Sequence, residues 1–199
     1  MNRINRIAIL GGDERQAALA QMLSECGYQT VVWAVRGNLG EAVSCHKWQT
    51  AVNGADAIIL PIVAEDENGR INAPFYQDDV PPSLLDILDK STGVICAGKL
   101  SRDFSATAKI WGREVFDYFS SEELKIRNAI PTAEGAVAIA IEEMNRTVFG
   151  SKAVVMGYGR IGSALSSLLT NMGAQVTVAA RKQRDLAWAE TLGYQAVHI

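Results

Sequence analysis

The sequence has few residues of the kinds that build metal sites and disulfide frameworks. It holds three cysteines and two histidines in 199 residues. Cys26, Cys45 and Cys96 are odd in number and widely spaced, which matches neither a disulfide framework nor a zinc-binding motif. Cys45 and His46 are neighbours, but adjacent side chains on a strand point to opposite faces and are poor joint ligands. We therefore expect buried or half-buried thiols and no metal site.

Long apolar runs and a surplus of one charge are also missing. Charged residues, glycine or proline interrupt each apolar segment before it reaches the length that crosses a membrane. The N-terminal residues 1–6 include arginine but lead into a short strand and Gly11-Gly12, not into the core of a signal peptide. The net charge is −3 with both signs interspersed, which indicates neither a nucleic-acid surface nor an acidic tail. With a hydrophobic content of 48%, the composition predicts a globular cytoplasmic enzyme.

A glycine motif is the most informative feature of the sequence. It follows the apolar run 154–156 and has glycines at 157, 159 and 162. The first glycine allows a sharp turn off a strand, the second lets a pyrophosphate approach the backbone, and the third lets the next helix pack against the strand. The free N–H groups and the positive end of that helix would hold the anion. A helical pattern and a second strand at 175–180 follow, as the motif requires. The residues expected to bind a dinucleotide are Gly157, Tyr158, Gly159, Arg160, Ile161 and Gly162.

Basic residues after the second strand indicate which dinucleotide binds. Folds that prefer NAD usually carry Asp or Glu about 20 residues after the last glycine. This chain has Arg181 there, followed by Lys182 and Arg184. A guanidinium can bind a 2′-phosphate through paired, charge-assisted hydrogen bonds. We therefore expect these residues to bind NADP, with NAD as the alternative. A solvated basic loop, or stacking of Arg181 on adenine, also fits the pattern.

The alternation of strands and helices predicts an α/β fold in two lobes. Residues 1–130 are expected to form a flavodoxin-like or Rossmann-like domain on the substrate side, and residues 151–199 the first half of a Rossmann dinucleotide-binding domain. The first lobe has a βαβ unit with Gly11 and Gly12 but without the third glycine of a nucleotide fold. We expect its strands at 6–10, 30–34, 56–61, 93–98 and 114–117.

A helix over residues 131–150 is expected to join the lobes. Pro131 fixes an extended entry, Thr132 is a good N-cap, and Glu134 lies in the first turn, where its charge complements the helix dipole. An apolar stripe runs from Val137 to Val148. The start of this helix should face the cleft, where ligands of open α/β folds bind. Glu134 therefore has two interpretations: a purely structural acid or an acid in the cleft.

The sequence ends in a third strand of the second lobe, at residues 195–199. A complete Rossmann domain has a second half, which takes on the order of 60 residues. We therefore expect an incomplete dinucleotide domain that by itself is inactive and binds the dinucleotide poorly or not at all. Because an unpaired apolar sheet edge invites association, we also expect a homo-oligomer.

Four motifs, in this order along the chain, resemble the family of dipicolinate synthase A subunits. These are NAD(P)-binding subunits of an enzyme of spore-forming bacteria. The most specific motif is the third, and Arg127 stands before it where the family has an aromatic residue. The glycine loop alone is shared with hydroxyacid dehydrogenases, alanine dehydrogenases and adenosylhomocysteinases. The motifs are Gly11-Gly12-Asp13-x-Arg15-Gln16, Ile59-Leu60-Pro61, Asn128-x-Ile130-Pro131-Thr132-x-Glu134-Gly135 and Gly157-x-Gly159-Arg160-x-Gly162.

The resemblance implies oxidation of dihydrodipicolinate to dipicolinate in spore formation, with hydride transfer to the nicotinamide. The protein would mainly orient the ring and remove a proton, for which Glu134 and Asp13 are the candidate catalytic residues. A dicarboxylate calls for cations or N–H donors. The candidates are Thr132 with the first amides of its helix, then Arg15, and then Lys99 and Arg102. The resemblance also implies a second, flavoprotein-like partner, the B subunit of dipicolinate synthase.

Two other functions stay open. A D-2-hydroxyacid or alanine dehydrogenase normally uses a His–acid or Lys–His set, and a chain with only His46 and His198 offers little for that chemistry. The other is a non-catalytic NAD(P)-binding module that senses redox state or docks a partner. An assay with dihydrodipicolinate and the candidate partner protein would separate the three functions.

Overall fold

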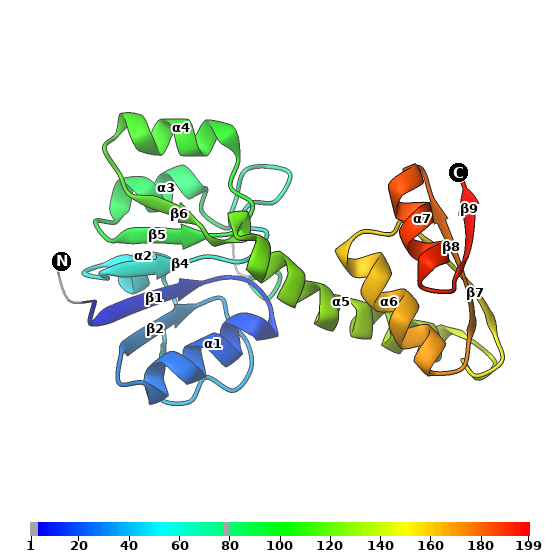
Figure 1. The fold of residues 1–199 in the computed structure, drawn as a ribbon. Coiled ribbons are helices and arrows are strands. Elements are labelled where there is room, and N and C mark those ends of the chain that lie inside the picture. Colours follow the sequence, from blue (N-terminus) through cyan, green and yellow to red (C-terminus); the bar gives the residue numbers. More distant parts are fainter. Residues whose placement is uncertain (1–3, 78–79) are drawn as a thin grey trace. The chain divides into compact units, whose positions relative to one another are not determined.

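Parallel strands separated by helices make up most of the chain (Figure 1). The structure, a computed structural model, describes residues 4–77 and 80–199. The chain divides into two units, Met1–Ser120 and Ser121–Ile199, each with its own sheet. The expected α/β fold with Rossmann-like units is therefore confirmed. Within the described ranges, no helix is both long and apolar enough to cross a lipid bilayer.

The first unit is built on a six-stranded parallel sheet in the order β3-β2-β1-β4-β5-β6. The order reverses between β1 and β4, which are hydrogen-bonded neighbours. In open parallel sheets ligands bind at the carboxyl ends of the strands beside such a reversal. The strands are β1 (Arg6–Leu10), β2 (Gln29–Trp33), β3 (Val43–Ser44), β4 (Ala57–Ile59), β5 (Val94–Ala97) and β6 (Val115–Asp117).

Helices cover this sheet and bury a core on each face. Neighbouring residues of a strand point to opposite faces, so Ile9 and Leu10 lie in different clusters. The cluster with Leu10 includes Trp33 and Phe104, and the cluster with Ile9 includes Ala20 of α1. The helices are α1 (Glu14–Glu25), α2 (Trp48–Val52), α3 (Leu84–Lys90) and α4 (Arg102–Ile110), and a short 3-10 turn, η1 (Tyr118–Ser120), follows β6.

The second unit is a long helix followed by a βαβαβ arrangement with the sheet order β7-β8-β9. Its core joins Val155 of β7, Val178 of β8, Leu169 of α6 and Val137 of α5. The strands alternate with helices as the sequence predicts. The elements are α5 (Glu122–Glu143), β7 (Lys152–Met156), α6 (Arg160–Asn171), β8 (Gln175–Ala180), α7 (Gln183–Thr191) and β9 (Gln195–His198).

The long helix α5 differs from the helix expected at 131–150. It begins at Glu122, after Ser121, whose side chain accepts a hydrogen bond from the Leu124 N–H, and it contains Pro131. The buried residues are Ala129, Ala133 and Val137. They recur every fourth residue on both sides of the proline, so packing keeps the helix continuous where local preference would start a new one.

Three expectations about this helix are therefore wrong, the first of which is an extended entry at Pro131, a residue that lies inside α5. Thr132 is not an N-cap, and Glu134 does not lie in a first turn, because both residues are inside α5. Residue 130, the expected end of the first domain, also lies within α5. The assignment of substrate binding to the first unit and dinucleotide binding to the second stays a prediction.

Candidate functional site

The glycine loop forms a tight turn between β7 and α6. Gly157 has a φ of +94°, a left-handed conformation that favours glycine, and its N–H donates to the Ala179 carbonyl at 2.7 Å. A Cβ at Gly162 would collide with the Gly157 carbonyl oxygen. Gly157 therefore permits the turn and Gly162 permits the close packing of helix on strand, as the sequence predicts.

The start of α6 offers unpaired backbone donors. Gly159 is the N-cap and has no side chain to cap the helix. The Ser163 N–H donates to the Gly159 carbonyl at 2.9 Å, and the amides of the three residues between them have no helical acceptor. A Cβ at Gly159 would meet no atom within 4 Å, so the backbone is open to a close ligand. A cavity of about 500 Å³ borders this loop and β7, with Met156, Gly157, Gly159, Arg160, Ile161 and Gly162 in its lining.

Two side chains of the loop are already engaged. Tyr158 stacks edge-on against Tyr194 with ring centres 6.0 Å apart, and burial raises its pKa, so this phenol stays neutral near pH 7. The Arg160 Nη1 donates to Glu122 Oε1 at 2.6 Å. In the expected dinucleotide-binding loop, the backbone is therefore accessible to a ligand, whereas the side chains of Tyr158 and Arg160 already have partners within the protein.

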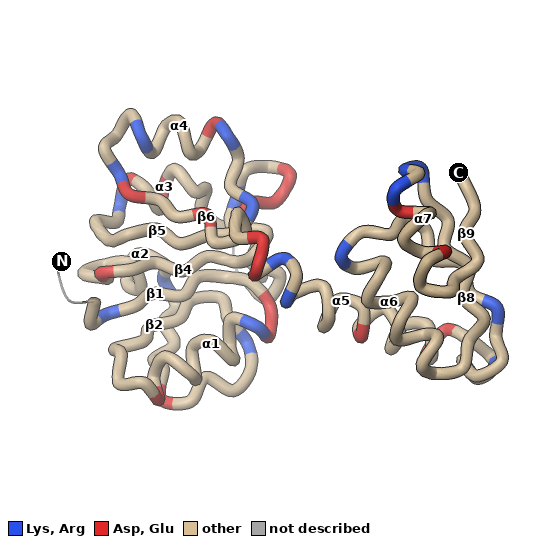
Figure 2. The backbone as a smooth tube through the Cα atoms, in the orientation of Figure 1, with Lys and Arg blue, Asp and Glu red and all other residues tan. Residues whose placement is uncertain are grey.

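The basic residues lie where β8 leads into α7 (Figure 2). Arg181 directly follows β8, and Lys182 is the N-cap of α7 but makes no side-chain cap. Arg184 Nε donates to Asp185 Oδ1 at 3.2 Å. In the described parts of the chain, Arg181 and Lys182 have no ion pair. Because β7 and β8 are parallel neighbours, these cations and the glycine loop both lie at the carboxyl ends of their strands.

At the carboxyl end of β1, Asp13 and Arg15 form an ion pair. Arg15 Nη2 lies 2.6 Å from Asp13 Oδ2, and Arg15 Nε donates to Asp13 Oδ1 at 2.9 Å. Asp13 also caps α1, in a capping box with Gln16. Hydrogen bonding from Arg15 holds the pKa of Asp13 below its ordinary value. A carboxylate with a lowered pKa is a weaker base, and the catalytic role expected for Asp13 stays a prediction.

Tyr118, which the sequence analysis did not identify, lies near this pair. Its hydroxyl donates to the Leu60 carbonyl at 2.7 Å. Burial raises the pKa of Tyr118 far above its ordinary value, and the charges of Arg15 and Asp13 also act on it. The side chain thus links the carboxyl ends of β6 and β4 beside Arg15. The only sequence signal is an aromatic residue directly after a strand, which is too common to identify a site.

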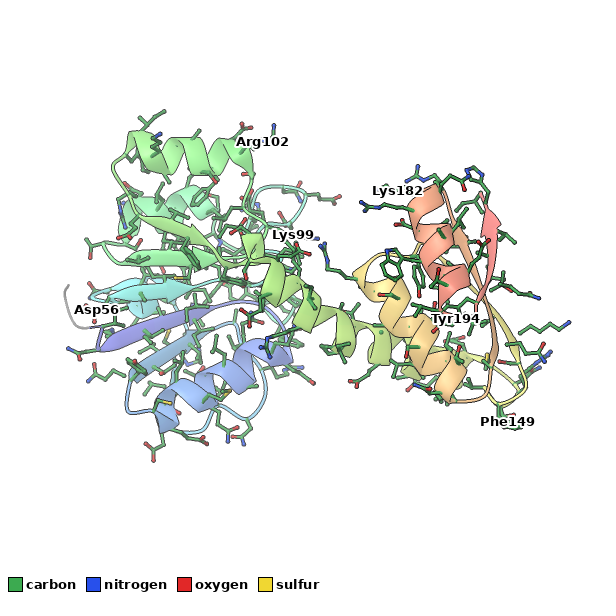
Figure 3. The ribbon with its side chains drawn as sticks, viewed as in Figure 1. Asp56, Lys99, Arg102, Phe149, Lys182 and Tyr194 are labelled. Carbon is green, nitrogen blue, oxygen red and sulfur yellow. The ribbon has the colours of Figure 1, made fainter. Side chains whose placement is uncertain are left out.

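Lys99 and Arg102 are further along the same unit (Figure 3). Lys99 has a φ of +55°, which is uncommon for a residue with a side chain. Asp117 holds this turn, because its carboxylate accepts from the Lys99 N–H at 3.2 Å. The Lys99 ammonium lies 5.6 Å from the centre of the Phe119 ring. Arg102 is the first residue of α4. Lys99 lies in the turn after β5, whereas Arg15 and Arg102 lie in the first turns of α1 and α4, the helices that follow β1 and β5.

Thr132 and Glu134 are exposed on α5, which belongs to the second unit. The Thr132 hydroxyl donates to the Asn128 carbonyl at 2.7 Å. The amides around Thr132 belong to the interior of a helix, where the backbone pairs with itself. The expected carboxylate site, made by Thr132 and the first amides of a helix, is therefore wrong in its geometry.

Comparison with known proteins gives one consistent family. Residues 6–119 match the family model of the N-terminal domain of the dipicolinate synthase A subunit. The chain is 30% identical over 201 residues to the A subunit of dipicolinate synthase from Bacillus subtilis (strain 168), and the match covers 97% of this chain and 66% of the relative. The chain thus spans slightly less than two thirds of that relative's length.

Solved structures agree with this result. The crystal structure of the dipicolinate synthase A chain from Bacillus subtilis matches with a TM-score of 0.71 and 29% identity, over 100% of this chain and 68% of that one. The dipicolinate synthase A subunit from Bacillus halodurans matches with a TM-score of 0.80 and 25% identity, over 98% and 68%. A transhydrogenase from Sinorhizobium meliloti, with a TM-score of 0.56 and 14% identity over 98% and 62%, shares the fold. The chain belongs to the family of dipicolinate synthase A subunits.

Proposed function

We propose that the second unit binds NADP, in preference to NAD, at the glycine loop. The observation that carries this proposal is the open backbone at Gly159, next to the tight turn at Gly157 and Gly162. Pyrophosphate would accept hydrogen bonds from the first amides of α6. Arg181 and Lys182, at the end of the neighbouring strand, would bind the 2′-phosphate. Basic residues at a helix start oppose the helix dipole, and a bound phosphate would compensate for that cost.

We propose further that the chain takes part in the oxidation of dihydrodipicolinate to dipicolinate, as its family membership suggests. The substrate would release hydride to the nicotinamide and a proton to a base, and the product is an aromatic dicarboxylate. Arg15 is the best-placed cation for a carboxylate, because Asp13 orients it through Nε and Nη2 and leaves Nη1 for a ligand. Lys99 is the second candidate. Glu134 stays our candidate for the base.

A binding assay and a turnover assay test this function. Calorimetry of the chain with NADP+ and with NAD+ measures affinity and preference. Absorbance then follows NADPH formation from dihydrodipicolinate, with and without the candidate flavoprotein-like B subunit. Hydride transfer that requires both proteins supports a two-subunit synthase. Dinucleotide binding without transfer under any condition fits both the incomplete domain expected from the sequence and a non-catalytic redox-sensing module, and absence of binding contradicts the proposal that this chain binds NADP.

We also propose that the chain associates with a second copy. Val154 and Met156 lie on one face of β7 and are 65% and 80% exposed. In the described residues, β7 pairs with β8, and its other edge lies beside this apolar surface. Such an edge is prone to pairing with another chain. We propose this association for the 199-residue chain, which spans 66% of the length of the relative from Bacillus subtilis. Light scattering that gives a monomer mass at high protein concentration would contradict this proposal.

A further inference from the structure

The arginine of the glycine loop is held by an acid from a distant part of the second unit. Arg160 Nη1 and Glu122 Oε1 are 2.6 Å apart, and the two side chains are 48% and 61% exposed. Lys125 Nζ lies 4.0 Å from the other oxygen of Glu122. Glu122 is the first residue of α5 and Arg160 is the first residue of α6. The ion pair therefore connects the starts of two helices.

A dinucleotide in the glycine loop would compete for the same guanidinium. Arg160 lines the cavity at the loop together with Gly157, Gly159 and Gly162. A pyrophosphate bound to the first amides of α6 would place negative charge next to Arg160. Because Glu122 contacts Arg160, that charge would also lie close to the Glu122 carboxylate. Carboxylate and pyrophosphate repel each other, and both accept the charge-assisted hydrogen bonds that a guanidinium donates.

We propose that Glu122 competes with the dinucleotide pyrophosphate for Arg160, so that the ion pair lowers the affinity of the loop and opens when the dinucleotide binds. This inference rests on the proposed dinucleotide site. Glu122 acts here as an internal substitute for the phosphate that keeps Arg160 near the loop in the absence of ligand. When the pyrophosphate replaces Glu122 as the partner of Arg160, Glu122, the first residue of α5, loses this ion pair. Dinucleotide binding is therefore linked to the start of the helix that directly follows the first unit in the chain.

Glu122→Gln tests the proposal, and Glu123→Gln is a matched control. Both residues lie in the first turn of α5 and complement its dipole equally, but Glu123 pairs with Arg127 and not with Arg160. Removing the competitor should lower the Kd for NADP+ and for NAD+ in calorimetry. An exposed ion pair contributes little free energy, so the expected decrease in Kd is about two- to fivefold. The control variant should keep the wild-type Kd, and both variants should melt at the same temperature.

A second variant shows that the effect passes through Arg160. In an Arg160→Gln background, Glu122→Gln should change the Kd less than it does in the wild type, because the shared guanidinium is missing and only the direct repulsion between Glu122 and the pyrophosphate remains. Raising the salt concentration should also shrink the difference between the wild type and Glu122→Gln. An unchanged or weaker affinity of Glu122→Gln, while the wild type binds, overturns the competition and leaves the proposed dinucleotide site intact. Absence of dinucleotide binding by every variant overturns both.

Discussion

Gly162 packs so closely on the Gly157 carbonyl that no side chain fits between them. This contact sets the angle at which α6 leaves β7, and with it the direction of the first amides of α6. The turn also depends on the positive φ of Gly157. The geometry of the proposed dinucleotide loop therefore depends on glycine at both positions 157 and 162.

Replacing Gly162 by alanine should damage the second unit. Overpacking of a close contact costs about 1–3 kcal/mol, and here the obstacle is backbone, which cannot move aside as a flexible side chain can. We expect Gly162→Ala to lower the free energy of unfolding by this amount in urea denaturation and to remove dinucleotide binding. Gly135→Ala is the control: Gly135 lies in α5, and a Cβ there would meet no atom within 4 Å. That change should stabilise the protein by about 0.5–1 kcal/mol.

Arg181→Asp should reverse the cofactor preference. The carboxylate would repel a 2′-phosphate and could instead accept hydrogen bonds from ribose hydroxyls. Loss of a charged hydrogen bond should weaken NADP+ binding by about 1.5–3 kcal/mol, measured by calorimetry, with NAD+ binding unchanged or stronger. Arg146→Asp makes the same change in net charge at an exposed residue between α5 and β7 and should leave the preference as it is. Equal NADP+ and NAD+ affinities before and after Arg181→Asp would contradict the assignment.

Thr132→Ala should have almost no effect on folding. The Thr132 hydroxyl bonds back to the Asn128 carbonyl within α5, and such bonds do not stabilise a helix. We expect the free energy of unfolding to change by less than about 0.5 kcal/mol. Ser121→Ala, in contrast, removes the observed N-cap of α5 and should cost about 1 kcal/mol. A larger loss for Thr132→Ala than for Ser121→Ala would mean that the helix starts at Thr132 in solution.

The elements predicted correctly from sequence depend on local signals. The strand–glycine–helix order around Gly157 and Gly162 needs only neighbouring residues, and its turn is the one observed. The alternation of apolar strands with helices in the first unit is local in the same sense. Both features follow from hydrophobic periodicity and from glycine at turns.

The start of α5 was predicted wrongly because its evidence is not local. Pro131 and Thr132 have the residue types of a helix start, while the buried face of the preceding turns rests on Ala129, a weak hydrophobic signal. Packing against the rest of the second unit decides the outcome. Tyr118 was missed for a related reason: its hydroxyl bond to Leu60 spans 58 positions of the chain, and a single sequence carries no sign of such a pairing.

The pair between Asp13 and Arg15 gives a pH dependence of known sign. A carboxyl group whose pKa is lower in the folded than in the unfolded protein stabilises the fold above the unfolded value, and this contribution disappears as the pH falls through the folded value. The pKa of Asp13 is lowered, chiefly by hydrogen bonding from Arg15, and the pKa of an aspartate in an unfolded chain is about 3.9. The pair should therefore contribute fully at pH 7 and lose its contribution in acid below about pH 4.

Asp13→Asn isolates this contribution, because asparagine caps a helix about as well as aspartate does. We expect it to lower the free energy of unfolding at pH 7 by about 0.2–1 kcal/mol, as for other exposed ion pairs, and to have a much smaller effect at about pH 2, well below the unfolded pKa. Arg15→Gln should give the same loss at pH 7, and the double variant should lose no more than either single variant. Denaturation at both pH values measures all three. A loss for Asp13→Asn that is as large in acid as at pH 7 would assign the effect to the helix cap and not to the ion pair.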